Sequence, residues 1–453
     1  MTDLLVRGAA GILTGGRGAD ARASGDIRIR GGCIAAIGAL TPEPGEAILD
    51  ASGCVVLPGL ISTHHHLFQS VLKAVPAGID LALEGWLRTV AYRYWHRIDQ
   101  QALVVAATIG MAELLLSGCT TVADHHFLFS DSYDFDPADI LFATARRLGL
   151  RLVLCRGGAT RGRTFDIPGT VAMPTEPLDV MLGRVERLAA RWHDPSPDAK
   201  TRIVLAPTTP SRSLDEGELR EVAQAARAMR LMLHGHLAET ANCRRFIEDS
   251  FGAKPVPWLA KHGWLGADVW LAHLVHVDDE EVALLAQTGT GMAHCPQSNC
   301  RLGSGIAPAD ALDRLGGRVS LGVDGAASNE SADMVSEMHS CWQVHRAAKG
   351  PGAVSAQDVL RWATDGGAKV LNISALGRVA VGKTADLAIF PLDHPRFAGM
   401  HDPLIAPIIG GGIARPRDVL RAGRRVVQDF AIPGLDLSAL AAQAAEVVRS
   451  IAA

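Results

Sequence analysis

The histidines of this chain cluster at the ends of short apolar segments that we expect to be strands. Of the 17 histidines, ten lie at or just past the ends of five such segments: His64, His65, His66, His125, His126, His234, His236, His273, His276 and His294. Neutral imidazoles are common ligands of divalent transition metals. The spacing therefore suggests metal chemistry, provided that the fold brings these distant segments to one place.

A parallel barrel would bring them together. Apolar, β-branched runs alternate with helical stretches of 12 or more residues, which predicts repeated βα units. The runs cover residues 55–62, 120–123, 151–155, 201–206, 230–234, 269–272, 290–293 and 318–323. Eight such units predict an α/β fold, a (β/α)₈ TIM barrel over residues 58–375, with function at the carboxyl ends of its strands.

The segments on either side of the barrel have a different pattern. Residues 1–57 and 376–430 consist of short strands separated by glycine turns, and we expect them to form one small β-sandwich domain together. Residues 431–453 keep a helical period and predict a terminal amphipathic helix that packs on the protein.

Composition excludes several classes of protein. The chain has 453 residues, 48% of them hydrophobic, and a formal charge of −4. No apolar run approaches the ~18 residues of a membrane span, and no global basic field attracts nucleic acid. The start of the chain has no secretory pattern, so we expect a cytoplasmic protein without nucleic-acid or membrane partners. The eight cysteines form no Cys-x-x-Cys pair, and we expect neither disulfides nor cysteine-bound zinc.

The end of the first barrel strand has the spacing of a metal site. His64 and His66 point the same way because side chains alternate along a strand, whereas His65 points elsewhere. Asp324 follows the last strand at the same barrel face. A solvated loop and a turn-capping aspartate are the simpler alternatives. Imidazoles plus a carboxylate suit Zn²⁺, with Fe²⁺ as the alternative, and an open position would acidify a bound water.

Several motifs together carry a family resemblance. They are His64-x-His66, His236-x-x-Glu239, His273, His294-Cys295-Pro296-x-Ser298-Asn299, Asp324-Gly325-x-x-Ser328-Asn329 and Gly382-Lys383-x-Ala385-Asp386-Leu387. The chain resembles the deaminase and chlorohydrolase branch of the amidohydrolase superfamily over nearly its whole length. The segments 63–70 and 156–160 resemble the isoxanthopterin (pterin) deaminases and, less closely, the 8-oxoguanine deaminases.

The resemblance implies roles for particular residues. One divalent ion would be held by His64, His66, His236 and Asp324. Binuclear relatives need a lysine at the end of the fourth strand, which here reads Ala-Pro-Thr-Thr at 206–209. Glu239 would be the proton shuttle and His273 would polarise the attacking water, so that the catalytic residues are Glu239, His273 and Asp324.

The chemistry of deamination agrees with these roles. Amide ion is too poor a leaving group, so a proton must pass from water to the ring nitrogen and on to the departing ammonia. A carboxylate three residues beyond a ligand is well placed to carry it. The alternative for Glu239 is a solvated glutamate at a helix start, where the helix dipole favours negative charge.

Substrate contacts are expected from Gln69, Trp86, His125 and Arg156. Gln69 and Arg156 can read the amide edge of a heterocycle, and Trp86 belongs to an aromatic loop that can stack on a flat ring. For Arg156, a structural ion pair is an equal alternative. His125 could instead lie behind the metal ligands, and the aromatic loop could simply pack against the barrel rim.

The sequence therefore predicts a metal-dependent deaminase of a small heterocycle, most simply isoxanthopterin, in a homo-oligomer. An 8-oxoguanine or related purine or pyrimidine deaminase and an s-triazine hydrolase are the alternatives within hydrolases. A cyclic amide hydrolase is disfavoured by the missing lysine. A non-catalytic barrel that binds metal and acts by interaction would be expected to have lost Glu239, His273 or Asp324, and all three are present.

Overall fold

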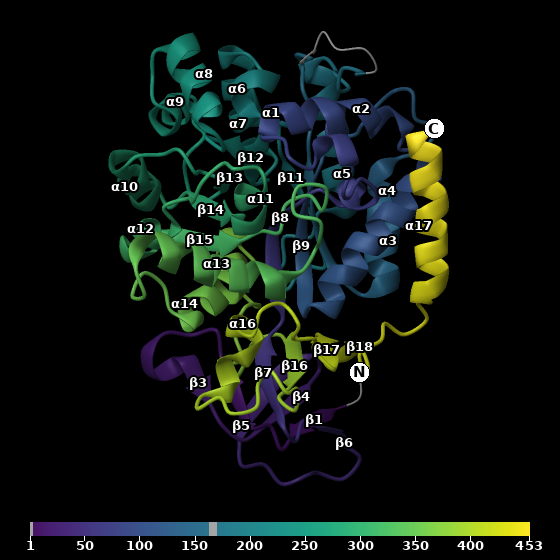
Figure 1. The fold of residues 1–453 in the computed structure, drawn as a ribbon, viewed down its shortest axis with the longest axis vertical. Helices are drawn as coiled ribbons and strands as arrows, with labels where there is room; N and C mark the ends of the chain where they lie inside the picture. Colours follow the sequence, from purple (N-terminus) through teal and green to yellow (C-terminus); the bar gives the residue numbers. More distant parts are fainter. Residues whose placement is uncertain (1–2, 163–169) are drawn as a thin grey trace.

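The computed structural model describes residues 3–162 and 170–453. Residues 1–2, in the predicted N-terminal β segment, and 163–169, in the predicted barrel, lie outside the described residues. Figure 1 shows a barrel surrounded by helices, with a smaller β domain below it and the C-terminal helix along one side. The predicted fold class is confirmed.

The barrel is a parallel sheet of eight strands in the order β15 to β8. Its strands are β8 Leu60–His65, β9 Cys119–His126, β10 Arg151–Arg156, β11 Thr201–Leu205, β12 Leu233–Leu237, β13 Val269–His273, β14 Gly291–His294 and β15 Arg318–Leu321. A parallel bridge between His65 and Asp324 brings β8 beside the end of β15. Residues that are 259 positions apart in the chain (324 − 65) therefore meet at one face.

Helices cover the outside of the barrel (Figure 1). They include α3 Gln100–Leu116, α4 Pro137–Leu148, α5 Leu178–Trp192, α7 Glu216–Ala228, α8 Ala241–Phe251, α9 Pro255–Lys261, α10 Asp279–Thr288, α11 Pro296–Arg301, α12 Ala309–Arg314, α13 Met334–Lys349, α14 Ala356–Arg361 and α15 Gly367–Val370. Several begin at an aspartate whose side chain accepts a backbone N–H, as Asp99 does at α3 and Asp215 at α7. Such caps satisfy donors that a helix start leaves free.

Two predicted strands differ from the observed ones. Residues 55–62 form two strands, β7 Cys54–Pro58 in the β domain and β8 in the barrel, with Gly59 between them. A Cβ at Gly59 would lie 2.5 Å from Thr120 Oγ1, so only glycine permits the crossing. The strand expected at 230–234 is β12, which begins at Leu233, because Arg230 has a left-handed φ of 56° after the end of α7.

The small β domain is formed by the segments that precede and follow the barrel in the chain. One sheet contains β1 Leu4–Arg7, β4 Asp26–Arg30, β5 Cys33–Gly38 and β6 Ala47–Asp50. The other contains β2 Gly11–Leu13, β3 Arg22–Ala23, β7, β16 Leu387–Pro391, β17 Asp418–Arg421 and β18 Arg424–Val427. β7 pairs with β16, and both sheets bury side chains in one common core. A buried ion pair between Arg151 and Asp386 links this domain to β10.

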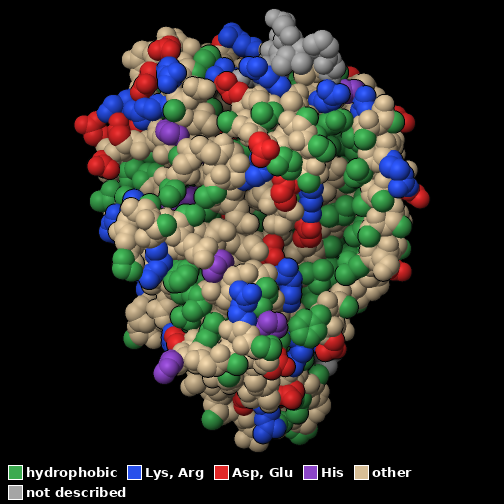
Figure 2. Space-filling view, in the orientation of Figure 1, with side chains coloured by type: hydrophobic (Ala, Val, Ile, Leu, Met, Phe, Trp, Pro, Cys, Tyr) green, Lys and Arg blue, Asp and Glu red, His purple; other side chains and the backbone are tan. Residues whose placement is uncertain are grey.

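The C-terminal helix α17, Leu437–Ala452, packs against α3. Leu440, Val447 and Ile451 are its buried residues, and Arg97 donates to the carbonyl of Ile451. Within the described residues, no helix combines the length and the apolar character that crossing a membrane would require. On the face drawn in Figure 2, basic and acidic side chains are interspersed rather than segregated.

Candidate active site

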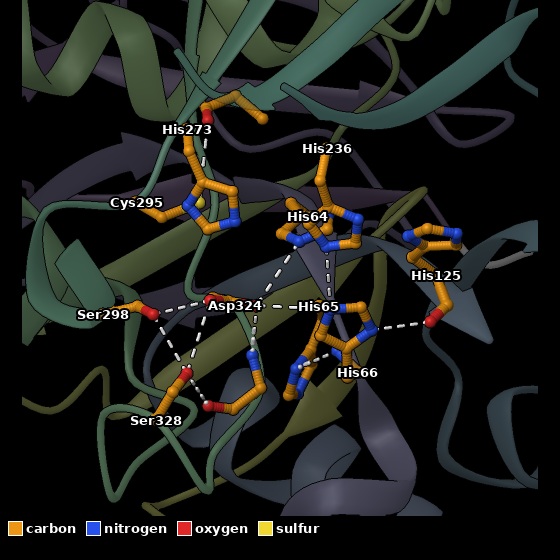
Figure 3. A network of polar contacts seen from close by, with 12 residues as sticks. His64, His65, His66, His125, His236, His273, Cys295, Ser298, Asp324 and Ser328 are labelled. Carbon is orange, nitrogen blue, oxygen red and sulfur yellow. Dashed lines mark hydrogen bonds and ion pairs between the residues drawn. The ribbon is translucent and has the colours of Figure 1, made fainter. Parts of the chain in front are cut away.

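Four predicted metal ligands meet at the carboxyl end of the barrel (Figure 3). His64 Nε2 and His66 Nε2 lie 3.3 and 3.4 Å from the same oxygen, Oδ1 of Asp324. His236 Nε2 lies 3.2 Å from His66 Nε2. His65 turns away toward α3, where the absence of a side chain on Gly110 leaves room for its ring. The structure thus brings together His64, His66, His236 and Asp324.

Hydrogen bonds behind the rings fix where their protons lie. His66 Nδ1 and His236 Nδ1 donate to the carbonyls of His125 and Thr208, each at 2.7 Å. His64 Nδ1 contacts His234 Nε2 at 2.9 Å, and His234 Nδ1 donates to a backbone carbonyl. His234 Nε2 is therefore an acceptor, and His64 Nδ1 must be the donor.

It follows that His64 and His66 each turn an Nε2 lone pair toward Asp324, and that His236 turns its Nε2 lone pair toward that of His66. Burial lowers the pKa of all three, so the imidazoles are neutral at neutral pH. Lone pairs and a carboxylate oxygen repel one another at these distances unless a cation lies between them. Three imidazole nitrogens and one carboxylate fit a divalent transition ion such as Zn²⁺.

Asp324 is held in place by its neighbours. Ser298 Oγ donates to Asp324 Oδ2 at 2.6 Å, and Ser328 Oγ lies 3.3 Å from the same oxygen. The backbone N–H of Gly325 lies 2.7 Å from Oδ1. Each carboxylate oxygen of Asp324 thus accepts a hydrogen bond from a fixed donor, which favours the charged form. Asp324 is therefore ionised, as a ligand must be.

Glu239 and His273 lie beside this ligand set. Glu239 Oε2 is 3.8 Å from His273 Nε2, and His273 Nδ1 lies 3.0 Å from Asn299 Oδ1, to which it donates. Burial raises the pKa of Glu239 to about 7, with His273 acting in the opposite direction. A carboxyl group with a pKa near neutrality can both accept and release a proton during turnover.

A cavity opens directly above these residues. It holds ≈ 1200 Å³ when its opening to solvent is included. His66, His236, Glu239, His273 and Asp324 line its floor, and α1 Leu83–Trp86, η4 Leu87–Ala91 and Tyr92 contribute an apolar wall. The concave, mostly apolar shape with a few polar groups is typical of a small-molecule site.

Two of the predicted substrate-binding residues line the cavity. Gln69 is buried and its Oε1 has no hydrogen-bond partner among the described residues. Trp86 donates its indole N–H to the carbonyl of Ala327, which leaves the ring itself as a flat wall. An unpaired amide oxygen beside an aromatic face suits a planar heterocycle with N–H groups.

The other two predicted substrate-binding residues lie elsewhere. His125 donates through Nε2 to the carbonyl of Ala206, and its ring lies 4.9 Å from that of His236, behind the ligands. Arg156 is buried, ion-paired with Glu176 and stacked 4.3 Å from the ring of Phe129. Neither residue is part of the described cavity lining.

Sequence reasoning missed two arginines that line the cavity. Arg212, on the short helix α6 Pro210–Ser213, lies 3.6 Å above the ring of Phe246, and Arg161 pairs with Asp215. Arg212 follows the fourth barrel strand, a position that would have marked it as a candidate. The end of that strand contributes the Thr208 carbonyl to His236, not a lysine.

Comparisons with known proteins agree with this geometry. A model of the amidohydrolase family matches residues 55–423. The chain is 49% identical to an isoxanthopterin deaminase from an unknown prokaryotic organism, over 99% of this chain and 97% of that protein. It is 40% identical to an 8-oxoguanine deaminase of Pseudomonas aeruginosa, with 88% of each covered. A variant atrazine chlorohydrolase from Arthrobacter aurescens TC1, complexed with zinc and atraton, matches with a TM-score of 0.90 at 29% identity, over 98% of this chain and 100% of that one.

Proposed function

This chain belongs to the amidohydrolase family and is a hydrolytic deaminase, and we propose that its substrate is a pterin, with isoxanthopterin first and 8-oxoguanine second. The observation that carries the proposal is the ligand set His64, His66, His236 and Asp324, of which His66, His236 and Asp324 line the floor of a cavity together with Glu239. Similarity to an isoxanthopterin deaminase over nearly the whole of both chains supports the choice of ring.

The four ligands fit a single divalent ion. Their Nε2 lone pairs and Asp324 Oδ1 face one another with no proton between them, and residues 206–209 offer no lysine for a second ion. A divalent ion bound there supplies a Lewis acid that brings the pKa of water toward neutrality. Zn²⁺ is our first choice and Fe²⁺ the alternative.

Glu239 carries the protons in this proposal. Its carboxylate takes a proton from the attacking water and delivers it to the ring nitrogen beside the amine-bearing carbon. The C–N bond then breaks, the carbon keeps the water oxygen as a carbonyl, and the second water proton leaves with ammonia. His273, which Asn299 holds in place, polarises the attacking water next to Glu239. Because the leaving group needs a proton, an intact shuttle favours ammonia release over chloride release.

The cavity walls orient the ring. We assign Gln69 to the amide edge of the heterocycle and Trp86 with Tyr92 to its faces, since all three line the cavity. Arg212 is placed to contact a ring carbonyl, because a guanidinium offers a fixed fork of donors. We do not assign Arg156 to the substrate, because it is ion-paired with Glu176 and does not belong to the described lining of the cavity.

Ammonia release measured across a panel of pterins, oxopurines, cytosines and triazines tests the proposal. We expect the highest kcat/KM on isoxanthopterin, with the 2-oxo ring and ammonia as products in equal amounts. Higher efficiency on 8-oxoguanine would favour the second candidate. Higher efficiency on cytosine or a triazine than on any pterin or oxopurine would refute the substrate class.

A further inference from the structure

A second cluster of metal-ligating side chains lies outside the barrel interior. His294 ends β14, and Cys341 and His345 lie one turn apart on α13, which covers that strand. All three residues are completely buried. None of them belongs to the described lining of the substrate cavity, and none contacts a ligand of the catalytic ion in the hydrogen bonds above.

The donor atoms of this cluster are as close together as those of the catalytic set. One ligand atom each from His294, Cys341 and His345 falls within 4.8 Å of the others. The two Nε2 atoms of His294 and His345 are 3.1 Å apart, against 3.2 Å for His66 and His236. Two imidazoles on one tetrahedral zinc at about 2.0–2.1 Å would place their nitrogens about 3.3 Å apart.

Each of the two imidazole rings has a buried nitrogen without a hydrogen-bond partner. Nδ1 of His294 and Nδ1 of His345 have no hydrogen-bond partner among the described residues. Asp310 Oδ1 lies 3.7 Å from His345 Nδ1, on the side away from His294. A cation between the Nε2 atoms would place protons on both Nδ1 atoms and direct that of His345 toward Asp310. Histidine ligands of metals usually have such a carboxylate partner.

We propose that His294, Cys341 and His345 bind a second divalent ion, Zn²⁺ or an ion of similar affinity for thiolate, in a structural site separate from the catalytic one. Cys341 gives up one proton to solvent for each ion bound, because the thiolate is the ligand. Burial raises the pKa of the free thiol well above its ordinary value, so only a bound cation favours the thiolate. Three protein donors leave one coordination position for a further ligand.

The ion would connect the barrel to a helix that supports the active site. Glu337, also on α13, accepts hydrogen bonds from the backbone and side chain of Gln297. The next residue, Ser298, donates to Asp324. Joining β14 to α13 thus stabilises the segment that orients a catalytic ligand. The sequence expectation of no cysteine-bound zinc rested on the absence of Cys-x-x-Cys, whereas Cys341-x-x-x-His345 uses the i, i+4 spacing of a helix face.

Cobalt substitution tests the proposal on the whole protein. Protein produced in cobalt-supplemented medium should contain two ions per chain and show a near-ultraviolet thiolate-to-cobalt band, since no cysteine belongs to the catalytic set. In Cys341→Ser the band should disappear and the content fall to one ion per chain. Cys155→Ser, which removes another fully buried thiol, should keep both ions and the band.

Three results would overturn the proposal: one ion per chain without the band in wild type, a band that survives in Cys341→Ser, or a band lost in Cys155→Ser. The second result would implicate another thiol, such as Cys295 beside His273 (Figure 3). If Cys341→Ser does not fold, X-ray absorption of wild-type zinc protein decides. A sulfur neighbour at about 2.3 Å supports the site, and nitrogen and oxygen neighbours alone refute it.

Discussion

Replacing Arg156 by methionine separates a structural from a substrate-binding role. The Arg156 side chain is 0% exposed, its Nη1 pairs with Glu176 Oε1, and its guanidinium stacks on Phe129. Arg184 Nη1 also contacts Glu176, at 2.9 Å. Methionine keeps much of the packing and removes the charge, so Glu176 loses one of its two cationic partners.

The expected cost is a loss of stability, not of specificity. Removing one partner of a buried ion pair costs about 3–5 kcal/mol. We expect the lower end, about 3 kcal/mol, because Arg184 remains and because Arg156 Nε and Nη2 lack partners in the wild type. At about 2.1 cal/mol/K per residue, this lowers the Tm by roughly 3 °C. The change in kcat/KM should be the same for isoxanthopterin and for pterin, which lacks the additional ring carbonyl.

Thermal denaturation and steady-state kinetics of Arg156→Met check this, with Arg212→Met as the matched control. Arg212 lines the cavity, so its variant should lose more kcat/KM on isoxanthopterin than on pterin. The reasoning would be refuted by an Arg156→Met protein of unchanged Tm that discriminates against isoxanthopterin. That result would mean that Arg156 leaves Glu176 to contact the substrate.

Four further predictions concern the catalytic residues and their support. Glu239→Gln should keep its metal and fold but lose about 10²–10⁴-fold in kcat. A variant that retains more than half of the wild-type kcat would show that Glu239 does not take part in the mechanism. The apparent pKa on the acid side of the kcat/KM profile against pH should lie between 4.5 and about 7, because burial raises the pKa of Glu239 while a bound cation lowers it. A kcat/KM that does not change across that pH range would contradict the assignment. Asp324→Asn should not retain the ion of the catalytic site, as measured by metal analysis, and should therefore be inactive. A variant that keeps the full metal content would exclude Asp324 as a ligand. Burial raises the pKa of Glu337 from 4.5 to about 8, so the free energy of unfolding falls as the pH rises through that window. In Glu337→Gln the free energy of unfolding should therefore depend less on pH and should be about 3 kcal/mol higher than in the wild type at pH 7. The same pH dependence in both proteins would disprove the shift.

The barrel, and the meeting of the four predicted ligands at one end of it, could be predicted because both depend on local patterns. Alternation along a strand places His64 and His66 on one face, and every ligand lies within a few residues of a strand end. The cavity walls could be predicted only in part, through Gln69 and Trp86. Arg212 reaches the site through α6, and the wall of α1 and η4 depends on how a long loop folds over the barrel. Neither position follows from periodicity.

Strand parity explains why Arg156 and His294 point away from the catalytic centre. In β10, Val153 and Cys155 pack in an inner cluster, whereas Leu152 and Leu154 pack between strands and helices. Arg156 lies an even number of residues from Leu152 and Leu154, so its side chain points to the same outer side of β10. In β14, Ala293 packs inward and Met292 outward, so His294 faces α13. Parity was available from the sequence at both positions, and it assigns both side chains to the outer layer.

The residues that escape parity are those with an unusual backbone. In β13, Leu271 packs outward, and regular alternation would send His273 outward as well. Its φ of 72° turns the side chain toward Glu239 instead, and Asp324 has a φ of 61°. Non-glycine residues in this region cost about 1–3 kcal/mol each and persist where surrounding contacts hold them. Asn299 holds His273, and Ser298 with Gly325 holds Asp324. The segment 298–299 therefore maintains two strained residues at once, which gives the His294-to-Asn299 motif a physical role without requiring any of its members to touch the substrate.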